Sequence, residues 1–289
     1  MTKRLRRFMF FYRVLWWIAL PLALTYLWWR GRKDARYTAN MAERFGKFRP
    51  TVKDPVWIHA VSMGELRSAV PLIRALLDRG ENVVTTHFTP VGRAEAERLF
   101  DHEIGQGRLQ ATWVPLEFPF AFDRFFRAFK PKLGLVMEIE IWPEMILSSQ
   151  RAGLPLFLCN AQYPRKSFDR DRTKSGWRLD LHRHVAGAFV KSDLQKERFA
   201  AAGVSDIEVT GELRFDQPVA ETQVTAGKAW KEKLAGRPAI ALPSVVEGED
   251  ETFISAIKSI ESEKPPLFIY IPRAPERFSE PAELLHKSN

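Results

Sequence analysis

From residue 55 onward, short apolar runs alternate with stretches in which apolar residues recur every three or four positions. The first kind of segment predicts strands and the second kind predicts helices. Strands that alternate with helices imply a parallel sheet covered on both faces, so the predicted fold class is α/β and Rossmann-like. The predicted strands are 56–61, 83–88, 112–115, 133–141, 154–160, 188–191 and 207–210. The predicted helices are 65–77, 120–129 and 193–202, and two more begin at Pro90 and Pro143. A long polar connection follows residue 160.

A polar stretch, residues 218–236, interrupts the alternation and predicts an interdomain connection with one short helix. A strand at 239–243, a helix at 249–262 and a strand at 267–271 are predicted after it. One helix between two strands cannot bury a self-sufficient core, so this second domain is expected to be incomplete. The sequence thus divides into an anchor (1–34), a first domain (35–220), a linker (221–236) and the start of a second domain (237–289).

The anchor segment is almost continuously apolar from residue 8 to residue 29, and Arg13 interrupts it early. A bilayer-spanning helix needs roughly 20 such residues. Tryptophans gather near both ends, as they do at membrane interfaces, and basic residues flank the segment on both sides. We interpret it as a membrane anchor that either spans the bilayer or lies in its interface; a signal peptide and a buried core helix are the alternatives.

Composition narrows the class of partner. The chain has 289 residues, a formal net charge of +9 and a sequence pI of about 9.7. This charge favours anionic partners such as phosphates, acidic lipids or nucleic acid. Cys159 is the only cysteine, which excludes an intramolecular disulfide and a zinc site with several cysteines. Basic residues are interspersed with acidic ones and no nucleic-acid module is present, so nucleic-acid binding is not expected.

The segment His59–Glu65 joins a predicted strand to a predicted helix. Ligands of open parallel sheets bind beyond the carboxyl ends of the strands, where helix N-terminal amides attract anions. Gly64 lets the backbone approach a ligand there, and the Glu65 carboxylate can act as a general base. Ser62 and Glu65 also have the spacing of a capping box, so a purely structural role stays open.

A second candidate segment, Met137–Pro143, contains two glutamates at the end of an apolar strand. Glu138 and Glu140 are two positions apart, so they share one face of that strand. Placing a carboxylate next to a buried strand costs free energy unless the carboxylate has a partner. The two glutamates therefore indicate either a binding role or an ion pair.

A basic stretch from residue 165 to residue 183 begins with Arg165 and Lys166. Its arginines can bind the phosphates of an acceptor in bidentate fashion, or the stretch can be a solvated loop and helix face.

Two further candidate segments follow the strands of the second domain, at residues 244–249 and 272–278. Arg273 and Arg277 could meet a nucleotide phosphate, and Ser244 could donate a hydrogen bond. Glu247 and Glu249, on either side of Gly248, could equally complement the dipole of the following helix. No GxGxxG, GxxxxGK[ST] or HExxH motif occurs, so the sequence does not indicate a dinucleotide-binding site, a P-loop or a zinc-protease active site.

These segments together resemble the Kdo (3-deoxy-D-manno-octulosonate) transferases of lipopolysaccharide assembly. The resemblance is carried, in order, by AERFG (42–46), HAVSMGE (59–65), THFTPVG (86–92), MEIEIWPE (137–144), the pair Asn160-Ala161, GELRFD (211–216), SVVEGED (244–250) and PRAPERF (272–278).

The resemblance implies a GT-B architecture with two Rossmann-like domains and transfer of Kdo from CMP-Kdo to a hydroxyl of a lipid A precursor, lipid IVA. It implies inversion at the anomeric carbon, no metal and no cofactor, on the cytoplasmic face of the inner membrane. It makes Glu65 the general base. Acceptor binding then falls to Ser62, Gly64, Glu138, Glu140, Arg165 and Lys166, and donor binding to Ser244, Glu247, Gly248, Glu249 and Arg273.

Two other functions stay open. A GT-B transferase with another nucleotide-sugar donor is motivated by Gln162 and Ala274, which stand where that family usually shows Arg and His. A catalytically silent lipid-binding paralogue is motivated by the incomplete second domain.

Overall fold

The computed structural model describes residues 1–174, 176–274 and 277–287. The chain divides into two compact units, Met1–Gln217 and Pro218–Asn289, and each is described by itself.

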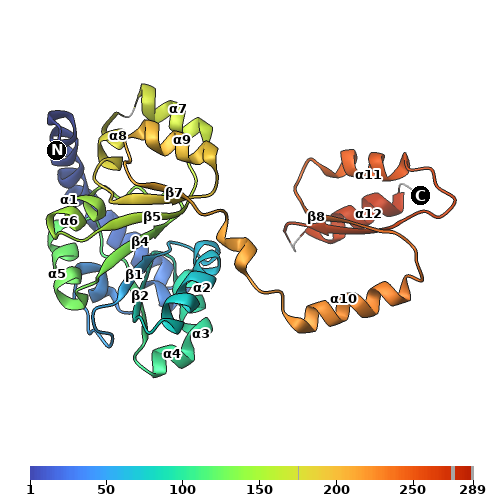
Figure 1. Cartoon of the computed structure of the whole chain (residues 1–289), viewed down its shortest axis with the longest axis horizontal. Coiled ribbons are helices and arrows are strands. Elements are labelled where there is room, and N and C mark those ends of the chain that lie inside the picture. The colour runs from blue at the N-terminus through green and yellow to red at the C-terminus, as the bar shows by residue number, and fades with distance from the viewer. Residues whose placement is uncertain (175, 275–276, 288–289) are drawn as a thin grey trace. The chain divides into compact units, whose positions relative to one another are not determined.

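The first unit is built on a seven-stranded parallel sheet (Figure 1). The strand order is β3-β2-β1-β4-β5-β6-β7, so β1 pairs with β2 on one side and with β4 on the other. Successive strands are added in opposite directions from this point, which makes the carboxyl ends of β1 and β4 the topological switch point. The strands are β1 (Val56–His59), β2 (Val83–His87), β3 (Leu109–Trp113), β4 (Leu133–Met137), β5 (Leu156–Ala161), β6 (Gly187–Val190) and β7 (Ile207–Val209).

Helices cover both faces of this sheet, as the alternating pattern predicted. The helices are α1 (Lys3–Gly31), α2 (Met63–Asp78), α3 (Pro90–Leu99), α4 (Asp101–Gly105), α5 (Pro119–Phe129), α6 (Pro143–Arg151), α7 (Arg165–Thr173), α8 (Gly176–His182) and α9 (Asp193–Ala202), with 3₁₀ turns η1 (Ala35–Tyr37), η2 (Met41–Phe45) and η3 (Leu213–Asp216).

The two largest buried clusters lie on opposite sides of the sheet, and one of them is rich in aromatic residues. Helix α5 shows how the sequence produces this core: Phe122, Phe125 and Phe129 recur at helical spacing and are all buried. Trp57 of β1 packs against Phe125 at 5.0 Å between ring centroids. The same pattern predicted the helix, and α5 confirms it.

Several predicted segments differ from the structure. The strand predicted at 112–115 is β3 at Leu109–Trp113, and the helix predicted at 249–262 ends at Lys258. The strand predicted at 133–141 ends at Met137, because Glu138 adopts a left-handed backbone with φ of 60° that breaks the extended chain. The connection after residue 160, predicted only as a long polar connection, contains α7 and α8. Only a few of its residues, such as Phe168 and Leu181, are buried, so its apolar periodicity was too sparse to identify.

Helix α1 packs along the first unit but keeps most of its surface exposed. Among the described residues, it is the one helix long and apolar enough to cross a membrane. Only Leu5, Met9 and Leu27 are buried, so the interpretation as a buried core helix is wrong.

The second unit contains a two-stranded parallel sheet, β8 (Ala239–Val245) and β9 (Leu267–Pro272). Its helices are α10 (Glu221–Lys233), α11 (Asp250–Lys258) and α12 (Ser279–Lys287). Most side chains of β8 are exposed, so this unit buries little apolar surface. Helix α10 has 13 residues and occupies most of the stretch that was expected to be a linker.

Candidate functional site

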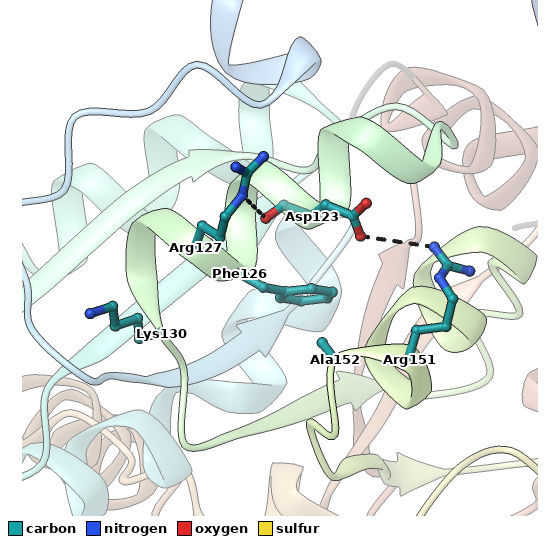
Figure 2. A pocket seen from close by; sticks show the side chains of 6 residues that line it. All are labelled: Asp123, Phe126, Arg127, Lys130, Arg151 and Ala152. Atoms are coloured by element: carbon teal, nitrogen blue, oxygen red, sulfur yellow. Dashed lines mark hydrogen bonds and ion pairs between the residues drawn. The ribbon is translucent and has the colours of Figure 1, made fainter.

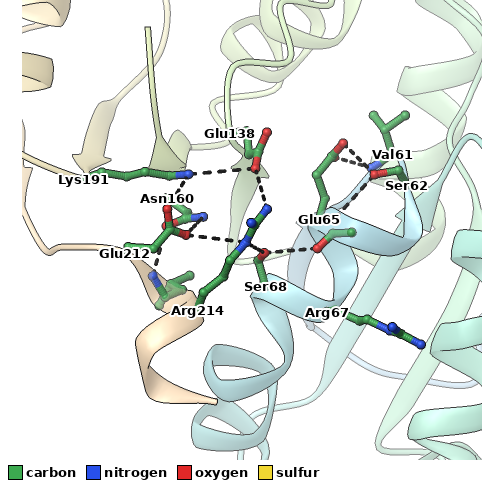
Figure 3. Close-up of polar contacts among 12 residues, drawn as sticks. Val61, Ser62, Glu65, Arg67, Ser68, Glu138, Asn160, Lys191, Glu212 and Arg214 are labelled. Atoms are coloured by element: carbon green, nitrogen blue, oxygen red, sulfur yellow. Dashed lines mark hydrogen bonds and ion pairs between the residues drawn. The ribbon is translucent and has the colours of Figure 1, made fainter. Parts of the chain in front are cut away.

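The candidate site lies at the carboxyl ends of β1 and of β4 to β7, and Glu65 is at its centre (Figure 3). Glu65 stands in the first turn of α2. One carboxylate oxygen accepts the Val61 backbone N–H at 2.7 Å and the other accepts the Ser62 hydroxyl at 3.0 Å. The Glu65 backbone N–H donates to the Ser62 hydroxyl at 3.4 Å, which is one half of the predicted capping box. The other half is shifted by one residue, because the carboxylate accepts the N–H of Val61 rather than that of the N-cap Ser62.

The environment of Glu65 also suits proton transfer. Partial burial raises the pKa of this carboxyl to about 7, although the hydrogen bonds from Val61 and Ser62 lower it. The negative charges of Glu140 and Glu138 raise it further. A carboxyl with a pKa near neutrality can exchange a proton at physiological pH, so the structure allows both the cap and the base.

The two glutamates after β4 face different partners. The Glu138 carboxylate lies 3.9 Å from the Lys191 ammonium and 4.0 Å from the Arg214 guanidinium. The Glu140 carboxylate accepts the indole N–H of Trp142 at 2.7 Å. The ion pairs at Glu138 are long and a third of this side chain is exposed, so it can also receive a ligand hydroxyl.

A polar network extends the site across β5, β6 and β7, and Figure 3 shows its members converging. Glu212 accepts hydrogen bonds from Lys191 at 2.8 Å and from the Asn160 amide at 3.0 Å. Asn160 in turn accepts the Leu213 N–H, and Arg214 donates to the Ser68 hydroxyl of α2 at 3.2 Å. The network therefore ties the segment after β7 to the helix that carries Glu65.

Sequence reasoning did not single out Lys191 as a site residue, nor Glu212 and Arg214 beyond their place in GELRFD. The available signal was position: Lys191 ends the predicted strand 188–191, where charged side chains reach the ligand edge.

Two glycines adjoin the site for different reasons. A Cβ on Gly92 would lie 3.1 Å from the Ser62 carbonyl carbon and 3.3 Å from the Met63 nitrogen, so this glycine lets α3 pack closely against the loop before α2. A Cβ on Gly64 would meet only the Ser62 hydroxyl oxygen, at 3.9 Å. The protein's own packing therefore does not require a glycine at position 64.

The buried histidines next to the site are neutral. Burial lowers the pKa of His59 to about 3 and that of His87 to about 4. The Nδ1 atom of His59 lies 2.9 Å from the Thr86 hydroxyl oxygen, and Nδ1 of His87 lies 2.8 Å from the Ala60 carbonyl oxygen. They hold the ends of β1 and β2 together rather than carry protons at neutral pH.

The predicted acceptor residues Arg165 and Lys166 begin α7, shortly after the carboxyl end of β5. The Arg165 side chain is 84% exposed and lies 3.6 Å from Asp169. No hydrogen bond or ion pair within the described part of the chain joins Arg165 or Lys166 to Glu65 or its partners.

The predicted donor residues lie in the second unit, at the ends of β8 and β9. Ser244 and Gly248 have left-handed φ of 61° and 90°. The Glu249 carboxylate accepts the Val246 N–H at 3.0 Å before α11, much as Glu65 does before α2. Arg273 and Glu247 are exposed, and positions 275 and 276 of the predicted 272–278 segment lie outside the described residues.

A cavity of about 420 Å³ lies elsewhere, between α5 and α6 (Figure 2). Its lining includes Lys130 and Ala152, which precede β4 and β5. It therefore opens at the amino ends of these strands, at the opposite edge of the sheet from Glu65. Within the described ranges, no group of three or more His, Cys, Asp or Glu residues is arranged to hold a metal ion.

Comparison with known proteins gives the site a family context. Residues 39–217 match the family described as 3-Deoxy-D-manno-octulosonic-acid transferase (kdotransferase). A 3-deoxy-D-manno-octulosonic acid transferase of Bordetella pertussis is 39% identical over 278 residues, which cover 92% of this chain and 64% of that protein. A protein of the same name from Haemophilus influenzae is 28% identical over 290 residues, covering 96% and 66%. The chain thus spans about two thirds of the length of these curated relatives.

Solved structures show similarity of fold. A UDP-GlcNAc 2-epimerase from Neisseria meningitidis bound to UDP-GlcNAc has a TM-score of 0.52 at 13% identity, over 81% of this chain and 69% of that chain. A glycosyltransferase from Rickettsia africae has a TM-score of 0.53 at 10% identity, over 82% and 65%. The α/β, GT-B-like fold class expected from the sequence is thereby confirmed.

Proposed function

This chain belongs to the Kdo transferase family, and on that premise we propose that it transfers Kdo from CMP-Kdo to a hydroxyl of a phosphorylated lipid A precursor. The observation that carries the proposal is the position of Glu65. This carboxyl lies at the switch point of the sheet, partly buried, with a pKa raised to about 7. An acceptor hydroxyl at this edge would meet a base that can take its proton at neutral pH.

In the proposed reaction, Glu65 removes the proton from the acceptor hydroxyl as that oxygen attacks the anomeric carbon of Kdo. The bond between this carbon and the phosphate oxygen of CMP breaks, and CMP leaves with the bonding electron pair. Attack opposite the leaving group inverts the anomeric centre. Ser62 can rotate its hydroxyl away from Glu65 as the acceptor arrives, while the Val61 N–H continues to orient the carboxylate.

The other predicted residues have supporting roles. Glu138 and Glu140 lie close enough to Glu65 to raise its pKa and can accept hydrogen bonds from acceptor hydroxyls. Arg165 and Lys166 would attract acceptor phosphates at the start of α7. In the second unit, Ser244, Gly248 and Arg273 would hold the nucleotide of the donor, and Glu247 and Glu249 would shape the turn between them. The proposed reaction uses no metal and no cofactor.

We further infer that α1 attaches the chain to the cytoplasmic face of the inner membrane, where a lipid acceptor is available. The support is its length of 29 residues and its apolar surface, flanked by basic residues.

The test uses the detergent-solubilised full chain with CMP-Kdo and a tetraacylated lipid A precursor, with product measured by mass spectrometry. Glu65→Gln is the informative variant, because glutamine can still accept the Val61 N–H but cannot take a proton. We expect transfer by the parent and a rate lower by about 10²–10⁴ in Glu65→Gln. Glu208→Gln, on the exposed side of β7, is the matched control and should keep full activity.

An inactive parent chain would contradict the proposal. Full activity in Glu65→Gln would contradict the assigned base and return Glu65 to the role of a helix cap. A parent that transfers a sugar from another nucleotide, and not from CMP-Kdo, would contradict the donor.

A further inference from the structure

Helix α1 has two apolar faces, and the protein covers only one of them. The covered stripe recurs every three or four residues and includes Leu5, Met9, Trp16 and Leu20, which join the core clusters of the first unit. On the opposite side, the exposed fractions of ten large apolar or aromatic side chains range from 42% to 74%. These are Phe10, Phe11, Val14, Leu15, Trp17, Ile18, Leu22, Tyr26, Trp28 and Trp29. An apolar surface of this extent is typical of an interaction site.

Polar contacts along the covered stripe fix α1 to the first unit. Arg13 donates to the Glu144 carboxylate from Nε at 2.8 Å and from Nη2 at 3.1 Å. The Tyr12 hydroxyl donates to Glu117 at 3.0 Å, and Arg4 donates to Asp180 at 3.0 Å. Each of these three acids is at least 98% buried, so withdrawing its partner on α1 would remove a hydrogen-bond donor from a carboxyl group inside the protein.

Aromatic packing reinforces the same attachment. The rings of Phe8 and Trp177 stack with centroids 3.8 Å apart and planes inclined by 9°. Further along the helix, Trp16 packs on Phe118 with centroids 5.9 Å apart. The contacts therefore extend over several turns rather than being confined to one end.

A helix held in this way cannot cross a bilayer. Spanning would surround residues 8–29 with hydrocarbon on all sides. The stripe that carries Arg13 is instead covered by α6 and α8, which belong to the α/β layers around the sheet. The helix is about 44 Å long at 1.5 Å per residue, which is longer than the hydrocarbon core, and it carries a docked domain on one side.

The charges at its ends fit a flat position. Lys3, Arg6 and Arg7 are exposed near the N-terminus of α1, and Arg32 and Lys33 follow its C-terminus. The Arg32 guanidinium lies 5.4 Å from the Trp28 ring and the Lys33 ammonium lies 4.9 Å from the Trp29 ring. Basic residues at both ends, with aromatic rings beside those at the C-terminal end, match the head-group level of a membrane. A flat helix places both ends at the level of one leaflet, and the docking of the covered stripe is what selects this orientation over spanning.

We propose that α1 does not span the membrane but lies flat in the head-group and upper acyl region of one leaflet, with its exposed aromatic face toward anionic lipid. The inference rests on the proposed membrane attachment and does not depend on the proposed sugar transfer.

Cysteine labelling distinguishes the two topologies. The test places single cysteines at Arg7→Cys and Lys33→Cys in a Cys159→Ala background, since Cys159 is the only native thiol. A membrane-impermeant maleimide is applied to intact spheroplasts and to inverted vesicles. We expect both positions to react from the same side of the membrane. Reaction of residue 7 from one side and residue 33 from the other would overturn the proposal.

Vesicle flotation of the purified chain tests the lipid-facing surface. We expect binding to phosphatidylglycerol vesicles to exceed binding to phosphatidylcholine vesicles. Leu22→Glu should weaken the former about tenfold or more, because one buried leucine contributes roughly 1.5–3 kcal/mol. Val224→Glu is the matched control, since Val224 is 42% exposed on α10 in the second unit. Unchanged binding in Leu22→Glu, or a lipid-free dimer that Leu22→Glu dissociates, would overturn the proposal, the latter by assigning the face to a second copy.

Discussion

Arg13 of α1 and Glu144 of α6 form a two-point ion pair, although 131 positions separate them in the chain. The Glu144 side chain is fully buried, and its other contacts are Ser148 and Arg151 of the same helix. Among these three side-chain partners of the Glu144 carboxylate, Arg13 is therefore the one that comes from outside α6. The pair couples the apolar N-terminal helix to the body of the first unit.

Removal of this arginine should destabilise the first unit. We expect Arg13→Ala to lower the free energy of unfolding by about 1–3 kcal/mol, because a buried carboxylate loses a charged donor. The lower end of the range applies, since the Arg13 side chain is 40% exposed. Denaturant unfolding in detergent measures the change. Arg7→Ala, also on α1 but exposed, should change little, and equal losses in the two variants would contradict the role of the pair.

Glu117 should make stability depend on pH. Full burial raises the pKa of this carboxyl to about 7, above its ordinary value of 4.5. The folded state therefore binds its proton more tightly than the unfolded state, so the contribution to stability is complete below pH 4.5 and is lost as the pH rises through 7. The loss for this group is about 3 kcal/mol. Urea unfolding at pH 5 and pH 8 should show a smaller decrease in Glu117→Gln, and identical decreases would refute the assignment.

Glu65 should set the pH dependence of sugar transfer. A general base must be deprotonated, and the pKa of Glu65 is raised to about 7. We expect the rate to rise with pH and to level off above 7, with roughly a tenfold decrease per pH unit well below that value. In Glu65→Gln the residual rate should lack this inflection. A parent profile that is flat between pH 5 and pH 8 would exclude Glu65 as the titrating base.

Gly64 offers a way to separate folding from ligand binding. A Cβ at this position meets only the Ser62 hydroxyl oxygen, at an ordinary contact distance of 3.9 Å. Gly64→Ala should therefore keep or slightly raise stability, by up to about 1 kcal/mol from helix propensity. If the acceptor approaches this backbone, the variant should raise the acceptor KM. Gly92→Ala is the contrasting variant, because its Cβ would press on the Ser62 and Met63 backbone and should cost stability as well.

The sequence predicted the parallel-sheet fold well because its strands are short apolar runs bounded by clear helix starts. The N-cap of α3 illustrates this: the Thr89 hydroxyl accepts the Gly92 N–H, and Pro90 begins the helix as predicted. The end of β4 was predicted too late, because a left-handed Glu138 leaves no trace in the hydrophobic pattern of Ile139 and Ile141.

The sequence predicted contacts of the candidate site between residues close together in the chain, but it did not predict those between residues far apart. The contact of Glu65 with Ser62 lies within one turn of chain, so spacing alone identified it. The contact with the Val61 N–H is equally local but was not predicted. The contact of Arg214 with Ser68 joins residues 146 positions apart, which depends on the order in which seven strands pair. Periodicity does not encode that order, so this part of the network required the folded structure.

The docking of α1 has a consequence for how the sheet edge that carries Glu65 samples its surroundings. An anchor joined through a flexible linker lets a domain tumble and reach lipids at many heights above a bilayer. Because Tyr12 and Arg13 fasten α1 to the unit that carries Glu65, the unit cannot rotate independently of its anchor. With α1 lying in one leaflet, Glu65 would move over the membrane at a constant height and tilt, so its encounters with a lipid acceptor would reduce to a two-dimensional search.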